Sequence, residues 1–297
     1  MTSNDSPSND KHGGTGYGIS MWSSWLGCIL RAHLNYEARK GGRAGGGDTY
    51  YTALGTIIHL YLARWYRKES FDNLFMSPGV IHYTDSTKEK LKVWKAGLRV
   101  VNHYIATRKP NEFGRVIGVE FDLPHGKETF ETLGAAVGLP KYSLQIDLAT
   151  KVDKATAKRL SEETGSDVPP GVLIVDHKSG SRIDDKWARA MRYRLQFIAY
   201  MLGYTANPLP RAPKIVGLLA NGISTGTLGM VSRVFIPTPS VEEHAFFRRA
   251  AKGMAARKAQ AERGELFPEP SESRCFPRWG TPCRWFLNGT CYGPREE

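Results

Sequence analysis

Residues 171–180 read Gly-Val-Leu-Ile-Val-Asp-His-Lys-Ser-Gly, and this stretch indicates both the fold and the chemistry of the chain. Its four consecutive aliphatic residues predict a buried strand. Side chains alternate along a strand, so Asp176 and Lys178 at its end point to the same face of a sheet. A carboxylate can hold a divalent cation, and a neighbouring lysine can steady a water or a developing anion. Taken alone, the pattern fits such a site and a surface ion pair equally well.

A second carboxylate can be placed beside the first. Residues 142–152 predict another strand, which we expect to form a hairpin with the strand above, so that the start of one lies beside the end of the other. Asp147 then lies next to Asp176, whereas Asp153 lies at the opposite end of the hairpin, about 20 Å away. We therefore predict that Asp147, and not Asp153, belongs to the site. Without this pairing, Asp147 would merely begin a strand.

His59 lies in a helix predicted over residues 50–67, whose apolar residues recur at helical spacing. A lone histidine in such a helix is usually a packed core residue. Imidazole is also a transition-metal ligand, however, and Gly55 one turn earlier would let another part of the backbone approach closely. His59 is therefore a candidate ligand, with a core role as the alternative.

The helix predicted over residues 184–204 has two distinct faces. On a 3.6-residue repeat, one face is polar and consists of Arg189, Arg192, Gln196 and Tyr200. A separate apolar face accounts for packing and consists of Met191, Leu195, Ile198 and Leu202. The polar face suits phosphate contact and active-site hydrogen bonding, although a solvated helix face would look the same.

The composition is that of a basic globular protein. The 297 residues are 41% hydrophobic and 24% charged, and the formal net charge is +12, which favours a polyanionic partner. No apolar run approaches the roughly 20 residues of a membrane span. Residues 1–18 are rich in Ser, Asn and Gly and lack the apolar core of a signal peptide. We therefore expect a disordered tail over residues 1–18, no membrane partner and a cytoplasmic location.

One cysteine stands near the start of the chain and three stand near its end: Cys28, Cys275, Cys283 and Cys291. Disulfides are not expected in a reducing compartment, so ligation of a metal or a cluster is the better interpretation. Four thiolates can hold a [4Fe–4S] cluster or zinc. Four unrelated buried cysteines are the alternative.

Helical segments come first along the chain, and a sheet follows. Further helices are predicted over residues 20–36, 86–108 and 241–263, further strands over 115–123, 214–220 and 230–236, and a long polar connection over 154–170. This order predicts an α/β or α+β sheet domain with helical and cysteine-rich flanks. We expect a helical part over 19–110, a core sheet over 111–240, and a basic helix with a cysteine-rich tail over 241–297, all in one compact domain over 19–297.

The order of these residues resembles the RecB-like branch of the PD-(D/E)XK nuclease superfamily. That branch carries a motif histidine, an aspartate, an Asp-x-Lys and a Gln-x-x-x-Tyr in this order, which here match His59, Asp147, Asp176-His177-Lys178 and Gln196 to Tyr200. Each motif alone is weak, but the combination spans about residues 20–291 and is specific. The resemblance implies a restriction-endonuclease-like fold, with a central mixed sheet flanked by helices.

The resemblance also implies roles for these residues. Mg²⁺ or Mn²⁺ would be bound by His59, Asp147, Asp176 and the main-chain carbonyl of His177. Lys178 would orient or deprotonate the attacking water, and Gln196 and Tyr200 would position the phosphate or brace the carboxylates. The DNA backbone would be contacted by basic residues of two helices, namely Arg189, Arg192, Arg248, Arg249 and Lys252.

Some members of this branch, such as the AddB nuclease and CRISPR-associated exonucleases, hold an iron–sulfur cluster. They place one cysteine before the motif histidine and three near the C-terminus, and the four cysteines here follow the same layout. The resemblance therefore implies one structural [4Fe–4S] cluster. Seven residues separate successive C-terminal cysteines here, whereas the family often has two and then five, so zinc is kept as the alternative.

The sequence thus predicts a metal-dependent deoxyribonuclease, an exonuclease that processes DNA ends in recombination, repair or phage DNA metabolism. Its partner would be single-stranded DNA or duplex ends. The chain has no Walker phosphate loop, so it would act alone or with a separate helicase or recombination partner. A non-catalytic DNA-binding or recombination-accessory protein with the same fold is the alternative function.

Overall fold

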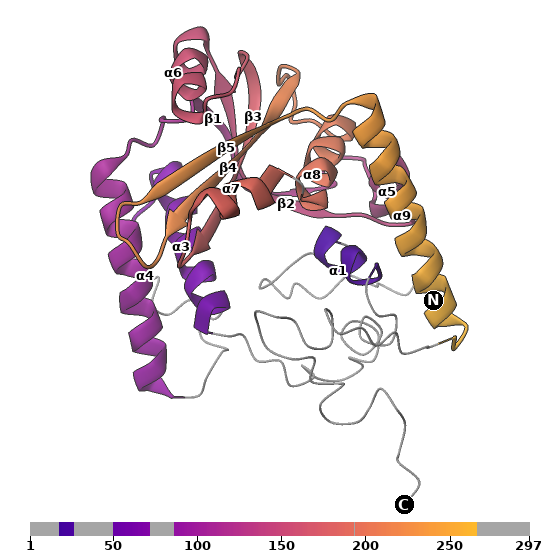
Figure 1. Ribbon diagram of the computed structural model, residues 1–297, viewed down its shortest axis with the longest axis horizontal. Helices are drawn as coiled ribbons and strands as arrows, with labels where there is room; N and C mark the ends of the chain where they lie inside the picture. Colours follow the sequence, from indigo (N-terminus) through magenta and orange to yellow (C-terminus); the bar gives the residue numbers. More distant parts are fainter. Residues whose placement is uncertain (1–17, 27–49, 72–85, 193, 266–297) are drawn as a thin grey trace, which may run out of the picture.

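A computed structural model describes residues 18–26, 50–71, 86–192 and 194–265 (Figure 1). Five strands form one sheet in their order along the chain: β1 (Arg115–Leu123), β2 (Leu144–Val152), β3 (Gly171–Gly180), β4 (Ile215–Ser224) and β5 (Val231–Pro237). Neighbouring strands are antiparallel except β3 and β4, which are parallel. The predicted mixed sheet is therefore confirmed. The four cysteines, and the predicted disordered tail up to residue 17, lie outside the described residues.

Helices cover both faces of this sheet (Figure 1). Within the described residues they are α1 (Ile19–Ser24), α3 (Tyr50–Arg67), α4 (Thr87–Thr107), α5 (Phe130–Val137), α6 (Lys154–Thr164), α7 (Asp185–Arg192), α8 (Leu195–Ala206) and α9 (Val241–Glu262). Across this described part of the chain, no helix combines the length and the apolar character that a bilayer crossing requires.

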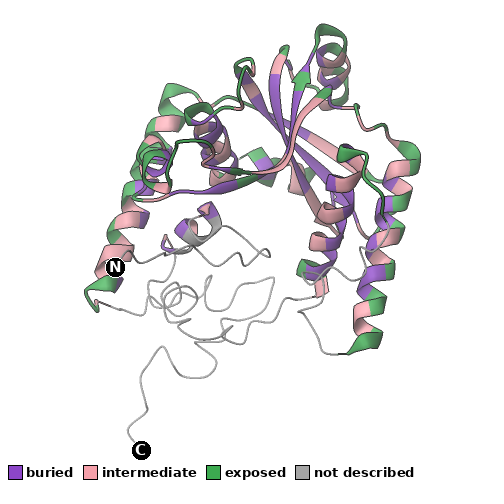
Figure 2. Cartoon of the chain, turned by 180° about the vertical axis from the view of Figure 1, so that it is seen from behind, coloured by how far each residue is buried: buried purple, intermediate pink, exposed green. Residues whose placement is uncertain are grey.

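Alternating side chains of the strands feed two hydrophobic cores, one on each face of the sheet. Ile174 and Leu218 belong to the core built with α1, α5, α8 and α9, whereas Leu173 and Leu219 belong to the core built with α3, α4 and α6. Figure 2 shows the strands buried between helices whose outer surfaces are exposed. The sheet is thus a rigid layer on which a site can be positioned from both sides.

The prediction of a long polar connection over residues 154–170 is wrong, because residues 154–164 form α6. This helix buries only two apolar residues, Ala157 and Leu160, and most of its other residues are polar, so its composition resembles that of a loop. Caps specify its ends instead. The Asp153 side chain accepts a hydrogen bond from the Thr156 N–H at 2.8 Å, and Gly165 adopts the left-handed conformation at φ 64°.

The single helix predicted over residues 184–204 is also wrong, because α7 ends at Arg192 and α8 begins at Leu195. Arg194 has extended backbone angles, φ −76° and ψ 120°, so the helix cannot continue through it. The predicted polar stripe is therefore divided between two helices. The predicted apolar face does pack: Met191 is buried in the core, and Leu195, Ile198 and Leu202 are partly buried against it. The most deeply buried residues of α8 are others, namely Phe197, Ala199, Met201, Gly203 and Tyr204.

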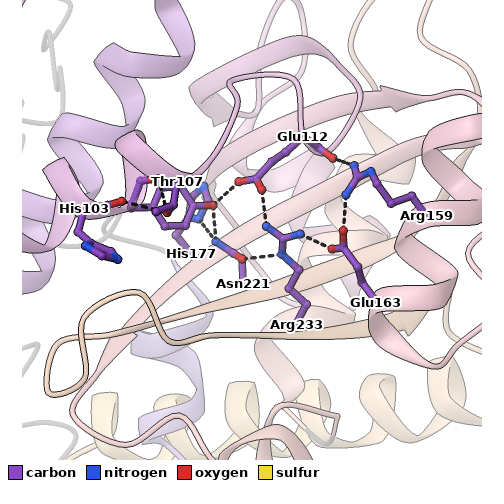
Figure 3. A network of polar contacts seen from close by, with 9 residues as sticks. His103, Thr107, Glu112, Arg159, Glu163, His177, Asn221 and Arg233 are labelled. Atoms are coloured by element: carbon purple, nitrogen blue, oxygen red, sulfur yellow. Dashed lines mark hydrogen bonds and ion pairs between the residues drawn. The ribbon is translucent and has the colours of Figure 1, made fainter.

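A buried arginine ties α6 and the segment before β1 to the edge strand β5 (Figure 3). Arg233 of β5 forms ion pairs with Glu112 and with Glu163 of α6. Arg159 of α6 also pairs with Glu163 and donates to the main-chain carbonyl of Glu112. The side chains of Arg233 and Glu112 are only 6% and 8% exposed, so each charge depends on the other.

We expect Arg233→Ala to lower the free energy of unfolding by about 3–5 kcal/mol, because it leaves the Glu112 carboxylate buried without its cation. The matched control is Lys92→Ala, which removes an exposed pair with Glu89 and should cost at most about 1 kcal/mol. Urea unfolding followed by circular dichroism measures both losses. Equal, small losses in the two variants would contradict this expectation.

Candidate functional site

Distant segments of the chain meet where the aliphatic run of β3 stops. β2 pairs antiparallel with β3 so that Leu148 lies opposite Val175. One step further along the two strands, Asp147 and Asp176 are therefore neighbours. This is the hairpin arrangement expected from the sequence, and Asp153 lies at the other end of β2 as the cap of α6. The sheet thus brings two carboxylates together from positions 29 residues apart in the chain.

Asp147 makes most of the contacts in this cluster. Its Oδ2 accepts a hydrogen bond from the main-chain N–H of His177 at 2.8 Å and lies 3.4 Å from Nδ1 of His59, on α3. Burial opposes a charge on Asp147, but His59 and Lys178 outweigh burial and hold its pKa well below the ordinary value. Burial also opposes a charge on His59, yet Asp147 raises the pKa of His59 to about 9. The two side chains therefore form an ion pair.

Glu120 belongs to the same cluster, although the sequence analysis did not identify it. It lies on β1 beside Asp147, and its Oε1 is 4.0 Å from His59 Nδ1. One ligand atom from each of His59, Glu120 and Asp147 lies within 4.8 Å of the other two. Burial and the Asp147 carboxylate raise the pKa of Glu120 to about 8. Two carboxylates and one imidazole are a donor set that fits a divalent cation such as Mn²⁺.

The backbone at Glu120 is strained. Its φ of 45° lies in the left-handed region, which costs a residue other than glycine about 1–3 kcal/mol. Arg67 of α3 supports this conformation by donating to the carbonyl of Val119 at 2.8 Å. Strain at a residue that faces a charged cluster favours a functional role for its side chain. One feature of the sequence could have identified Glu120 as a site residue. It is a carboxylate between Val119 and Phe121 in a largely apolar strand.

Asp176 and Lys178 form an ion pair at the end of β3, as their alternation along the strand predicts. Lys178 Nζ lies 2.9 Å from Oδ1 and 2.8 Å from Oδ2 of Asp176. Burial, together with Asp147, raises the pKa of Asp176, although Lys178 acts in the opposite direction. The lysine side chain keeps 23% of its surface exposed, whereas Asp176 is 2% exposed. Lys178 is therefore the member of the pair that can reach a bound substrate.

Gln196 and Tyr200 still reach the cluster from α8, despite the break between α7 and α8. Gln196 Nε2 donates a hydrogen bond to the Tyr200 hydroxyl oxygen at 2.8 Å. Burial raises the pKa of Tyr200, and the Asp176 and Asp147 carboxylates raise it further. Tyr200 therefore stays protonated and can donate a hydrogen bond towards these carboxylates or towards a ligand between them.

The side chain of His177 lies edge-on to the His59 ring, at a centroid distance of 6.3 Å, but carries no charge itself. Its ring stacks on Tyr66 at a centroid distance of 5.6 Å, on the face of the sheet covered by α3 and α4. Arg233 Nε donates to Oδ1 of Asn221, so the amide nitrogen of Asn221 faces His177 Nδ1, at 2.9 Å (Figure 3). Burial lowers the pKa of His177 to about 3, so the ring is neutral and anchors the end of β3.

The predicted DNA-contacting residues lie on two helices at the surface. On α7, Arg189 and Arg192 are exposed. On α9, Arg249 and Lys252 are exposed, and Arg248 donates to the carbonyl of Ala136 at 3.2 Å. Because α9 packs against α1 and α8 at the flank of the fold, its basic residues are not part of the carboxylate cluster (Figure 1).

We expect Mn²⁺ to raise the melting temperature of the wild-type protein by about 5 °C at a hundredfold excess over its Kd, because a ligand of the folded state stabilises it by mass action. Asp147→Asn should abolish this shift, and Glu120→Gln should reduce it. Asp122→Asn is the matched control, since it neutralises an exposed carboxylate of β1, the strand that also carries Glu120. Differential scanning fluorimetry with Mn²⁺ or with EDTA measures the shifts. A full shift in Asp147→Asn would contradict the site.

Comparison with known proteins gives a family and distant structural matches. A family model described as the PD-(D/E)XK nuclease superfamily matches residues 20–285, nearly the whole chain. A search of curated proteins gives no match. Among solved structures, the chain is similar to a proposed exonuclease from Eubacterium rectale, with 14% sequence identity, 97% of both chains covered and a TM-score of 0.46.

Proposed function

The chain belongs to the PD-(D/E)XK nuclease superfamily, and on this premise we propose that it is a divalent-metal-dependent deoxyribonuclease that degrades DNA from its ends. One observation carries the proposal. The sheet and α3 gather an imidazole, several carboxylates and a partly exposed lysine at one point, from segments that are far apart in sequence. A structural ion pair would need only one acid and one base, so this excess of acidic groups favours a cation site.

The donor set fits Mg²⁺ or Mn²⁺. His59, Glu120 and Asp147 would hold the cation, and Asp176 and the main-chain carbonyl of His177 would supply further ligands from the next strand. When bound, the cation would polarise the scissile phosphate and lower the pKa of a bound water. The imidazole ligand slightly favours Mn²⁺ over Mg²⁺.

The remaining groups would act on water and phosphate. Lys178 would orient or deprotonate the attacking water and offset the negative charge that grows on the phosphate. Asp176 would hold the lysine in place, since it contacts Nζ through both oxygens. Tyr200, positioned by Gln196, would donate a hydrogen bond to the phosphate or to a carboxylate.

The order of the motifs and the layout of the cysteines support a finer assignment to the RecB/AddB-like branch, and with it exonuclease action in recombination, repair or phage DNA metabolism. The formal net charge of +12 supports a polyanionic substrate. The exposed arginines of α7, which directly precedes α8, would contact the DNA backbone near the cluster. The exposed basic residues of α9 would contact it farther away.

We further propose that Cys28, Cys275, Cys283 and Cys291 hold one [4Fe–4S] cluster with a structural role. Four thiolates are a complete ligand set for such a cluster or for zinc. The described residues that flank the cysteines support the proposal. The main-chain carbonyl of Leu26, two residues before Cys28, accepts a hydrogen bond from Arg257 of α9 at 3.3 Å. Among the described residues, α9 is the last helix before the C-terminal cysteines.

Variants should separate the reacting groups from their neighbours. We expect Lys178→Ala and Asp176→Ala to lower the rate of DNA cleavage at least about 100-fold, because each removes a group that acts on water or phosphate. Asp147→Asn should abolish cleavage, and Asp153→Asn, which changes only the cap of α6, should keep it. Initial rates with Mg²⁺ and with Mn²⁺ on labelled DNA measure the effects. Loss of activity in Asp153→Asn with retention in Asp147→Asn would reverse the assignment.

The proposed function itself is tested with uniformly labelled DNA in four forms: single-stranded and duplex, each linear and circular. We expect linear DNA to be degraded in the presence of Mg²⁺ or Mn²⁺, with EDTA preventing it, and circular DNA to survive. Cleavage of circular DNA would show an endonuclease. A wild-type protein that binds all four forms and cleaves none of them would instead be the non-catalytic DNA-binding protein.

The cluster proposal predicts a brown protein after anaerobic purification, with broad visible absorption and iron and sulfide present. Replacing any one of the four cysteines by serine should release the iron and lower the melting temperature, because the ligand set is then incomplete. If the protein is colourless and carries zinc, the assignment of an iron–sulfur cluster is wrong and the four cysteines bind zinc instead. Absence of both metals from folded, active protein would refute a four-cysteine site.

A further inference from the structure

An open cavity of about 390 Å³ lies at the ends of β3 and β4, and its lining begins one residue beyond Lys178 along β3. It is lined by Tyr51, Leu54, Ser179, Gly180, Ser181 and Thr225, none of which has a role in the chemistry above. Its volume is within the range of sites that hold small organic ligands, about 300–1,000 Å³. The lining combines one aromatic ring with three hydroxyl groups, so it is neither a purely apolar groove nor a charged pocket.

Helix α3 connects this cavity with the cluster. Tyr51, Gly55 and His59 follow one another at four-residue spacing, so they lie along one side of the helix. A Cβ at Gly55 would lie 3.3 Å from Ser179 Oγ, which places the end of β3 directly against the helix between the other two residues. At a rise of 1.5 Å per residue, Tyr51 lies about 12 Å along the axis from His59. A DNA strand covers this distance with a few nucleotides, because each stacked nucleotide adds about 3.4 Å.

Tyr51 offers an accessible aromatic face. Its residue is 70% exposed, and its ring is held edge-on against Tyr50 at a centroid distance of 5.5 Å. An exposed aromatic ring beside a path for a nucleic acid is a platform on which a base can stack.

The strand ends that line the cavity offer hydroxyl groups on a fixed backbone. Ser179 and Ser181 flank the end of β3, and Thr225 follows the end of β4. The Thr225 N–H donates to the Gly180 carbonyl at 2.8 Å, so the two strand ends are tied together. Hydroxyl groups of this kind can contact sugar and phosphate oxygens, which leaves the base free to face the tyrosine.

We propose that this cavity is a subsite for one nucleotide of single-stranded DNA, a few positions from the scissile bond, with its base stacked on Tyr51 and its backbone against the three hydroxyls. The inference rests on the proposed nuclease function and adds that the DNA is single-stranded at this subsite. A base inside a duplex is stacked between its neighbours, so the strand must be single-stranded where it passes Tyr51.

Single-stranded oligodeoxynucleotides that carry one abasic site, moved stepwise along the strand near the cleaved end, test this subsite. Wild-type protein should lose about tenfold in kcat/KM when the abasic site occupies one particular position, because stacking on the ring is lost there. Tyr51→Ala should lose about tenfold on intact DNA and show no further loss at that position. Tyr51→Phe and Tyr51→Trp should keep the wild-type profile. The loss should appear in KM, since the ring is distant from the reacting atoms.

Phe246→Ala is the matched control, because it removes an exposed aromatic side chain from α9, away from the cavity. Its kcat/KM and its abasic profile should equal those of the wild type, and the melting temperatures of all variants should agree. If the wild type cleaves DNA but Tyr51→Ala behaves like Phe246→Ala, the subsite is refuted and the nuclease function stands. If the wild type cleaves no DNA, the proposed function fails and the subsite fails with it.

Discussion

The antiparallel pairing of β2 with β3 is the constraint on which the site depends. Side chains alternate along each strand, so a slip of one residue would turn Asp147 to the opposite face. Burial prevents that slip, because Leu148 and Val175 fill the core under α3 and α4. Thr150, which is fully buried, also donates a hydrogen bond to the Phe113 carbonyl at 2.8 Å. The same alternation that builds the sheet therefore delivers the two carboxylates to one place.

Electrostatics then distinguish this cluster from a structural ion pair. Glu120, Asp147 and Asp176 lie near the cations His59 and Lys178, and Glu120 also lies near Arg67. The crowding of negative charge is visible in the directions in which the pKa values shift. The pKa of Asp147 is lowered by its partners, whereas burial and neighbouring negative charge raise the pKa values of Glu120 and Asp176. Like charges that are gathered and partly desolvated are destabilising unless a cation compensates them. A divalent cation would supply that compensation, and the same ion would serve hydrolysis.

Much of this arrangement could be predicted from the sequence, because strong periodicity marks the elements that carry it. The bounds of α3 and β1 agree with their predicted ranges, and the preference for Asp147 over Asp153 as the neighbour of Asp176 followed from the length of the hairpin. Helix α6 could not be found in this way, because caps define it more than apolar spacing does. The sequence analysis missed Glu120 for two reasons. The register of β1 against β2 shifts at a bulge, and the backbone of Glu120 is left-handed. Neither feature can be predicted from the spacing of apolar residues.

A crystal soaked in Mn²⁺, with the ion located by anomalous scattering, tests the central claim most directly. We predict one strong peak at about 2.0–2.2 Å from a carboxylate oxygen of Asp147, with the His59 imidazole and at least one of Glu120 and Asp176 also in contact with it. The peak should be absent from a crystal of Asp147→Asn. A wild-type crystal with Mn²⁺ bound elsewhere and none at Asp147, at a concentration that supports cleavage, would contradict the metal site and the mechanism built on it.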